Sequence, residues 1–101
     1  MCPMQLPRRT IELLTALGSD RLSGRELAHR YREEYSRTIS YGSLYTLMAR
    51  LHEQGWVTQE DSEDEDGRLR YFRITGDGAK NLRAVARDLD RFSARIKEQF
   101  A

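Results

Sequence analysis

Residues 40–55 have the sequence SYGSLYTLMARLHEQG. Ser40 is a favoured residue immediately before a helix, and Gly55 is a favoured residue just after one. The stretch between them therefore predicts a helix of about four turns. Its apolar residues recur at helical spacing and define the face that we expect to be buried: Leu44, Leu47, Met48 and Leu51.

Two further helices are predicted upstream of this one. The first begins near Pro7 and ends near Gly18, because proline suits the first turn of a helix and glycine suits its end. The second begins at Ser23, which is spaced to form a capping box with Glu26. Its apolar stripe consists of Leu27, Ala28, Tyr31 and Tyr35.

Downstream of residue 55 the apolar period changes from that of a helix to that of a strand. Residues 56–59 and 70–74 predict the two strands of a hairpin. The acidic stretch 60–66 between them ends in the turn signal Asp66-Gly67, and we expect its middle, residues 63–65, to be a solvated loop. Thr75 then caps a last helix over residues 77–100, which would span about 35 Å.

This order of elements predicts a mainly α (α+β) winged helix-turn-helix with a two-stranded wing. The length of 101 residues suits one compact domain, in which residues 1–75 form the winged helix-turn-helix and residues 76–101 form a C-terminal dimerisation helix. The apolar band of that helix is wide, so we expect it to pair with a second copy. The alternative is that the helix folds back fully onto its own domain. The residues expected in the dimer are Leu82, Val85, Leu89, Phe92 and Ile96.

Composition excludes several classes of protein. Hydrophobic residues make up 39% and charged residues 33%, and no apolar run approaches the roughly 18 residues that a membrane span needs. The N-terminus lacks the apolar stretch of a signal peptide, so a cytoplasmic location is expected. Cys2 is the single cysteine, and His29 and His52 have no partner at ligand spacing, so neither a metal site nor another cofactor is predicted. No catalytic constellation is evident, and enzyme activity is not expected.

The net charge of +1 conceals a marked asymmetry. Residues 1–37 hold seven arginines against five acids, residues 38–66 hold one arginine against seven acids, and residues 67–101 hold nine basic residues against four acids. Because salt screens exposed charges beyond about 8 Å, local charge decides what a phosphate-binding surface feels. The total charge therefore does not argue against a partner such as DNA.

The outer face of the 40–55 helix is small, polar and almost free of acids in its N-terminal half. Such a face suits entry into the major groove of double-stranded DNA. Tyr45 could equally be a half-buried core aromatic, and Arg50 could instead pair with Glu53 or Glu26. The residues expected to contact DNA are Ser40, Gly42, Ser43, Tyr45, Thr46 and Arg50 on this helix and Arg68 and Arg70 in the wing, with Arg8, Arg9 and Arg25 as further phosphate contacts.

The acidic stretch 60–66 opposes that expectation, because carboxylates repel phosphates. Either the wing tip points away from the duplex, or the acids lower the affinity for DNA. An acidic wing also favours a second hypothesis, in which the winged helix is a protein-interaction module, an anti-repressor or partner-binding module without direct DNA readout.

Two segments carry a family resemblance. Residues 39–55 resemble the signature segment of the PadR family of transcriptional regulators, in which a Ser-x-Gly-[Ser/Thr]-Leu-Tyr core leads into an apolar helix ending in Glu-x-Gly. Residues 67–75, GRLRYFRIT, resemble the wing of that family and the capped start of its last helix. The resemblance implies that Tyr45, Arg68 and Arg70 lie at the DNA.

The resemblance also implies a regulatory role. It implies a homodimer that usually acts as a repressor on a palindromic operator and is often released by a small molecule or another signal. Trp56, Tyr31 and Tyr35 could line an apolar effector pocket near the dimer seam, although such residues more often belong to the core.

Overall fold

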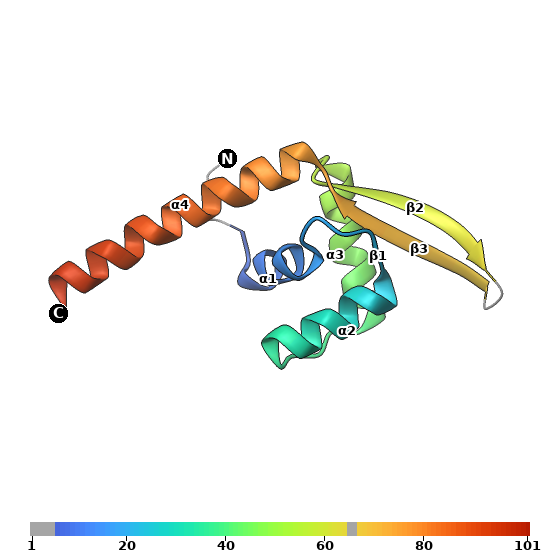
Figure 1. Cartoon of the computed structure of the whole chain (residues 1–101), viewed down its shortest axis with the longest axis horizontal. Helices are drawn as coiled ribbons and strands as arrows, with labels where there is room; N and C mark the ends of the chain where they lie inside the picture. Colours follow the sequence, from blue (N-terminus) through green and yellow to red (C-terminus); the bar gives the residue numbers. More distant parts are fainter. Residues whose placement is uncertain (1–5, 65–66) are drawn as a thin grey trace.

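The computed structural model describes residues 6–64 and 67–101, except for the side chains of residues 64 and 68. Its elements are α1 (Arg8–Leu17), β1 (Leu22–Ser23), α2 (Gly24–Tyr35), α3 (Tyr41–Glu53), β2 (Val57–Asp64), β3 (Gly67–Ile74) and α4 (Gly76–Gln99). Helices α1 to α3 form one group, the β2–β3 hairpin projects from one side of it, and α4 projects from the other (Figure 1). The molecule is consequently long, at 56 × 27 × 20 Å. This is the predicted α+β winged helix-turn-helix.

Helices α2, α3 and α4 begin at the hydroxyl residues that the sequence predicts. Ser23 and Glu26 form the capping box, in which each side chain accepts a hydrogen bond from the other residue's backbone N–H. Ser40 and Thr75 each accept a hydrogen bond from the backbone N–H three residues later, at 3.2 and 3.0 Å. The Thr75 hydroxyl also donates to the carbonyl of Gly55 at 2.6 Å, which ties the start of α4 to the segment after α3.

The three N-terminal helices and the base of the hairpin enclose one core. Helix α3 buries Leu44, Met48 and Leu51 on the predicted face, while Leu47 is half-buried. The largest fully buried side chains are Leu13, Leu14, Leu17, Leu27, Tyr31, Leu44, Met48, Val57, Phe72 and Val85. The core therefore fixes α3 by one face and leaves its opposite face exposed.

The sheet has three antiparallel strands in the order β1-β3-β2, so the hairpin gains a short third strand. Strand β1 pairs Leu22 with Phe72 and Ser23 with Tyr71. Leu22 is buried in the core, and no sequence signal predicts a strand at this position. A two-residue strand has no periodicity of its own by which to be recognised.

The expected loop in the acidic stretch is wrong for the residues that the structure describes there. Strand β2 continues to Asp64, with Glu60 opposite Tyr71, Asp61 opposite Arg70 and Glu63 opposite Arg68. Opposite charges facing each other across an antiparallel pair stabilise the strands, which offsets the low strand propensity of acidic residues. Residues 65 and 66, including the first half of the predicted turn, lie outside the described residues.

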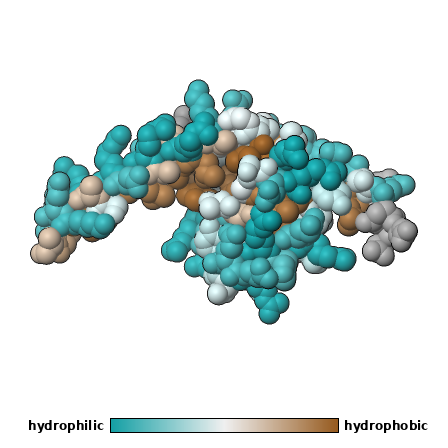
Figure 2. All heavy atoms as spheres, in the orientation of Figure 1, coloured by the Kyte–Doolittle hydropathy of each residue, from teal (hydrophilic) through white to brown (hydrophobic). Residues whose placement is uncertain are grey.

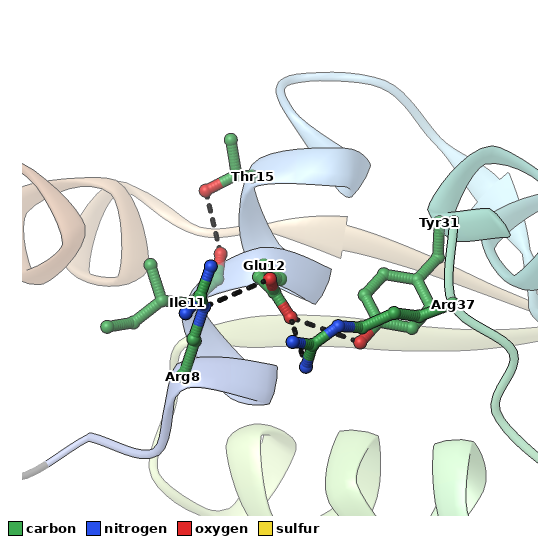
Figure 3. A network of polar contacts seen from close by, with 6 residues as sticks. All are labelled: Arg8, Ile11, Glu12, Thr15, Tyr31 and Arg37. Carbon is green, nitrogen blue, oxygen red and sulfur yellow. Dashed lines mark hydrogen bonds and ion pairs between the residues drawn. The ribbon is translucent and has the colours of Figure 1, made fainter. Parts of the chain in front are cut away.

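A buried carboxylate links α1 to α2 and to the segment before α3 (Figure 3). The side chain of Glu12 is only 7% exposed. Its two oxygens accept a hydrogen bond from the Tyr31 hydroxyl at 3.1 Å and one from Arg8 Nε at 3.3 Å, and Arg37 Nη1 lies 3.7 Å away. Because a buried charge requires such partners, this network holds α1 against α2 and the segment that leads to α3.

Helix α4 starts on the core and then leaves it. Gly78 packs so closely against the Trp56 carbonyl that a Cβ would clash, and Val85 is fully buried. Further along, Leu89, Phe92 and Ile96 are 46%, 55% and 57% exposed. Apolar atoms continue along the side of α4 that faces α1 and beyond it (Figure 2). No helix in the described part of the chain is both long and apolar enough to cross a bilayer.

Candidate nucleic-acid interface

The predicted DNA-contacting residues of α3 lie together on the face turned away from the core. Ser40, Gly42, Ser43, Thr46 and Arg50 are all exposed. They are small or polar apart from the long arginine, so the helix can approach a neighbouring surface closely. The carboxylate on this face, that of Glu53, lies in the last turn of the helix, away from its N-terminus.

An open hollow of about 860 Å³ runs beside this face. It lies between the start of α1 and α3, with Arg9 and Thr10 on one side and Ser43, Thr46 and Arg50 on the other. Neither Arg9 nor Arg50 forms an ion pair with any side chain that the structure describes, so Arg50 pairs with neither Glu53 nor Glu26. Two cationic groups therefore flank the hollow without a carboxylate partner in the described part of the chain.

A second, basic depression of about 410 Å³ lies at the N-terminal end of α3. Arg25, His29 and Arg32 of α2 line it together with Ser40 and Tyr41. Of the three basic residues, only Arg25 is expected here from the sequence, together with Ser40. The spacing of residues 25, 29 and 32 by four and three positions places them on one face of a helix, and this signal could have identified the other two. His29 Nε2 is 2.8 Å from the carboxylate of Glu33, one turn away, so Glu33 partly neutralises the positive charge of a protonated His29.

Tyr45 joins α3 to α2 and to the wing. Its ring lies against Gly24, where a Cβ would clash with the phenol, and its centroid is 6.0 Å from that of Phe72. Arg70 Cζ lies 5.9 Å from the Tyr45 centroid on the same side of the sheet. Tyr45 is half-buried. Its ring is thus a packing residue, and its hydroxyl lies over the first residue of α2.

Of the two wing arginines expected at the DNA, the one whose side chain is described is already paired. Arg70 Nε donates a hydrogen bond to Asp61 Oδ1 at 3.0 Å across the hairpin. On the other side of the sheet, Arg21 Nη2 lies 3.2 Å from Glu60 Oε1, and its Cζ lies 3.8 Å from the Tyr71 centroid. The side chain of the second predicted wing residue, Arg68, lies outside the described residues. Strand β2 thus neutralises arginines from two parts of the chain.

Arg8, expected as a phosphate contact, and His52 both have partners within the fold. Arg8 bonds to Glu12, and His52 Nδ1 lies 3.1 Å from the Val57 carbonyl at the base of the hairpin. Among the described residues no group of three potential metal-ligating side chains occurs, and Cys2 lies outside them.

The three aromatics considered for an effector pocket do not gather at one place. The rings of Tyr31 and Tyr35 are 5.6 Å apart, but Tyr31 is fully buried in the core. Tyr35 lines a hollow of about 480 Å³ between α1, α2 and α4, with Val85 and Leu89. Trp56 packs against the core and does not line that hollow.

Of the residues expected in the dimer, three are exposed and two pack on their own chain. Leu89, Phe92 and Ile96 are exposed, Leu82 packs partly against the core, and Val85 is buried. Phe100, which is 80% exposed, extends the exposed line to the end of α4.

Comparison with solved structures gives the same fold. A PadR family transcriptional regulator from Eggerthella lenta matches with a TM-score of 0.77 at 23% identity, over 90% of this chain and 80% of that one. The protein TA0346 of Thermoplasma acidophilum matches with a TM-score of 0.74 at 29% identity, over 88% and 86%. PadR of Bacillus subtilis in complex with operator DNA matches with a TM-score of 0.68 at 18% identity, over 76% and 46%.

Comparison with sequence families gives a direct assignment. A search of the curated proteins found no match. The description of the transcriptional regulator PadR-like family, in contrast, matches residues 13–84, from the middle of α1 into α4. Because this match covers most of the sequence, the chain belongs to the PadR-like family of transcriptional regulators.

Proposed function

We propose that this chain binds double-stranded operator DNA through the outer face of α3 and acts as a dimeric repressor. The observation that carries the proposal is that this exposed face has Arg9 and Arg50 beside it, with no ion-pair partner among the described residues. The Bacillus subtilis PadR with the same fold was solved on operator DNA, which supports the same use of the fold here.

The geometry suits the major groove, which is about 12 Å wide and admits one helix. Small side chains along α3 allow its N-terminal half to approach base edges: Ser40, Gly42, Ser43 and Thr46. Arg50 and Arg9 on one side and Arg25 and Arg32 on the other are positioned to contact the two phosphate strands that border the groove. Tyr45 supplies a hydroxyl donor beside the first residue of α2.

The dimer uses residues 76–101, while residues 1–75 bind DNA. Leu89, Phe92, Ile96 and Phe100 form an apolar stripe on α4 that its own domain leaves exposed. A second copy covers this stripe most economically, because two-fold pairing also places two α3 helices for the half-sites of a palindrome. Leu82 and Val85 anchor the same face of α4 to its own domain and so fix the direction in which the stripe projects.

Release from the operator by a small molecule completes the proposal. The hollow of about 480 Å³ between α1, α2 and α4 has the volume of a small-molecule site, and it borders the exposed stripe through Leu89. A ligand held there changes how α4 leaves the domain and therefore the spacing of the two α3 helices. A compound that binds this hollow should lower operator affinity, and Val85→Phe, which fills the hollow, should abolish the response to that compound.

The test of DNA binding is a salt titration with a mixed-sequence duplex and with the DNA next to the chain's own coding region. Phosphate contacts make the affinity fall steeply with salt, and Arg50→Ala should reduce the slope by about 0.9 per protomer. Arg87→Ala is the matched control, since Arg87 is exposed on the side of α4 away from the apolar stripe. An equal reduction of the salt slope in Arg50→Ala and Arg87→Ala would refute the role of α3 in DNA binding.

Sedimentation tests the dimer. Phe92→Asp places a charge in the apolar stripe and should give a monomer with an unchanged helix content. The charge-paired wing favours the alternative of a protein-interaction module. A dimer whose affinity for every duplex is negligible even in dilute buffer would support that alternative instead.

A further inference from the structure

The wing carries an acid opposite two of the three arginines of β3. The register of β2 and β3 places Asp61 opposite Arg70 and Glu63 opposite Arg68. Residues directly opposite in an antiparallel pair share one face of the sheet, with Cβ atoms about 5 Å apart. For Arg70 the pairing is realised as the 3.0 Å hydrogen bond from Nε to Asp61 Oδ1.

This pair lies on the face of the wing that borders α3. Phe72, two residues from Arg70 on the same strand face, packs on the Tyr45 ring, and Arg70 Cζ lies 5.9 Å from the centroid of that ring. A duplex seated on α3 would therefore meet Arg70 and Asp61 together. The phosphate that attracts the guanidinium repels the carboxylate beside it.

A phosphate can open the ion pair between Arg70 and Asp61, but the pair still reduces the attraction of Arg70 for that phosphate. The two side chains are 41% and 43% exposed, and solvent screens ion pairs at such exposure. A phosphate must nevertheless replace Asp61 as the acceptor of the hydrogen bond from Arg70 Nε, or bind Arg70 while the carboxylate of Asp61 remains next to it. In either case part of the attraction between wing and DNA is cancelled within the protein.

We propose that Asp61 is a positioning residue that holds Arg70 and thereby weakens the sequence-independent attraction of the wing for phosphate. Binding to random DNA consists almost wholly of phosphate attraction, so Asp61 reduces such binding and leaves discrimination to α3. This inference rests on the proposed function. It assigns the acidic β2 strand a role in the selectivity of the regulator.

The experiment compares the full-length chain with Asp61→Asn on a mixed-sequence duplex over a range of salt concentrations. Asparagine keeps the shape of the side chain and an acceptor oxygen but removes its charge, so the charge of Arg70 is no longer neutralised. The salt slope should steepen by about 0.9 per wing, and the gain in affinity should grow about threefold per wing between roughly 200 and 50 mM salt. Glu98→Gln changes the net charge equally at the exposed end of α4 and is the matched control.

A second background isolates the route through Arg70. In Arg70→Ala, the Asp61→Asn change should no longer steepen the slope, because no guanidinium remains to be released. Equal behaviour of Asp61→Asn and Glu98→Gln would overturn the proposal while leaving DNA binding by the wild type intact. A full gain in the Arg70→Ala background would overturn it too, since Asp61 would then act by direct repulsion. Failure of every variant and of the wild type to bind any duplex would overturn the proposed function and this inference with it.

Discussion

Arginines lie both beside the outer face of α3 and in the wing hairpin, but within the part of the chain that the structure describes those beside α3 are unpaired and one in the wing forms an ion pair. Beside α3, Arg50 and Arg9 have no carboxylate partner among the described residues. In the wing, Arg70 is held by Asp61. The number of basic residues at a surface therefore does not measure its attraction for phosphate, because a neighbouring strand can cancel the charge.

The largest expected difference between the two regions comes from placing the same acid in each. Thr46→Glu puts a carboxylate in the middle of the α3 face, where repulsion of phosphate should lower duplex affinity about 100-fold. Thr58→Glu makes the same change at an exposed position on β2 opposite Arg73, and should alter the affinity little. Fluorescence anisotropy with a labelled duplex measures both. Similar losses in the two variants would contradict the distinction drawn between α3 and the wing.

A smaller effect is expected where the two regions meet, at Tyr45. Gly24→Ala places a methyl group against the phenol and should lower the free energy of unfolding by about 1–3 kcal/mol, because the ring must move. The displaced ring also shifts relative to Arg70, and duplex affinity should fall several-fold. Urea denaturation and anisotropy measure the two quantities.

Gly42→Ala is the control for that change. No atom lies within 4 Å of the added Cβ, and alanine favours a helix over glycine by about 1 kcal/mol. Stability should therefore be unchanged or slightly raised. A destabilisation by Gly42→Ala as large as that by Gly24→Ala would show that the contact with Tyr45 is not the cause.

The smallest expected effect is that of removing the wing arginine itself. Because Asp61 already occupies Arg70, Arg70→Ala should lower duplex affinity by less than about threefold, well below the effect of Arg50→Ala. The two single variants measured side by side at one salt concentration check this order. A reversed order would mean that Arg70 leaves Asp61 entirely when DNA binds.

Much of this architecture could be predicted from local signals. The caps at Ser23, Ser40 and Thr75 set the starts of three helices, since each is a hydroxyl residue placed before an apolar period. The apolar residues of α3 predict its buried face, and the exposed face is the one opposite. These features depend on residues close together in the sequence, which is why pattern and spacing suffice for them.

What could not be predicted depends on contacts between distant residues. Glu12 is a carboxylate on a helix surface by pattern, yet it is buried because Tyr31 and Arg37, from α2 and the following segment, reach it. The acidic half of β2 has low strand propensity and forms a strand because β3 supplies its partners. The ion pair that changes the role of Arg70 arises only from that register.

Strand β3 places a core residue and a wing arginine on one face, two positions apart, as Phe72 and Arg70. Since side chains alternate along a strand, one residue inserted between them would turn Arg70 to the side of the sheet where Arg21 lies, whereas two inserted residues would keep its side. Among homologous proteins, insertions or deletions in this strand should therefore come in pairs of residues. An odd change would disconnect the arginine from α3 without disturbing the core.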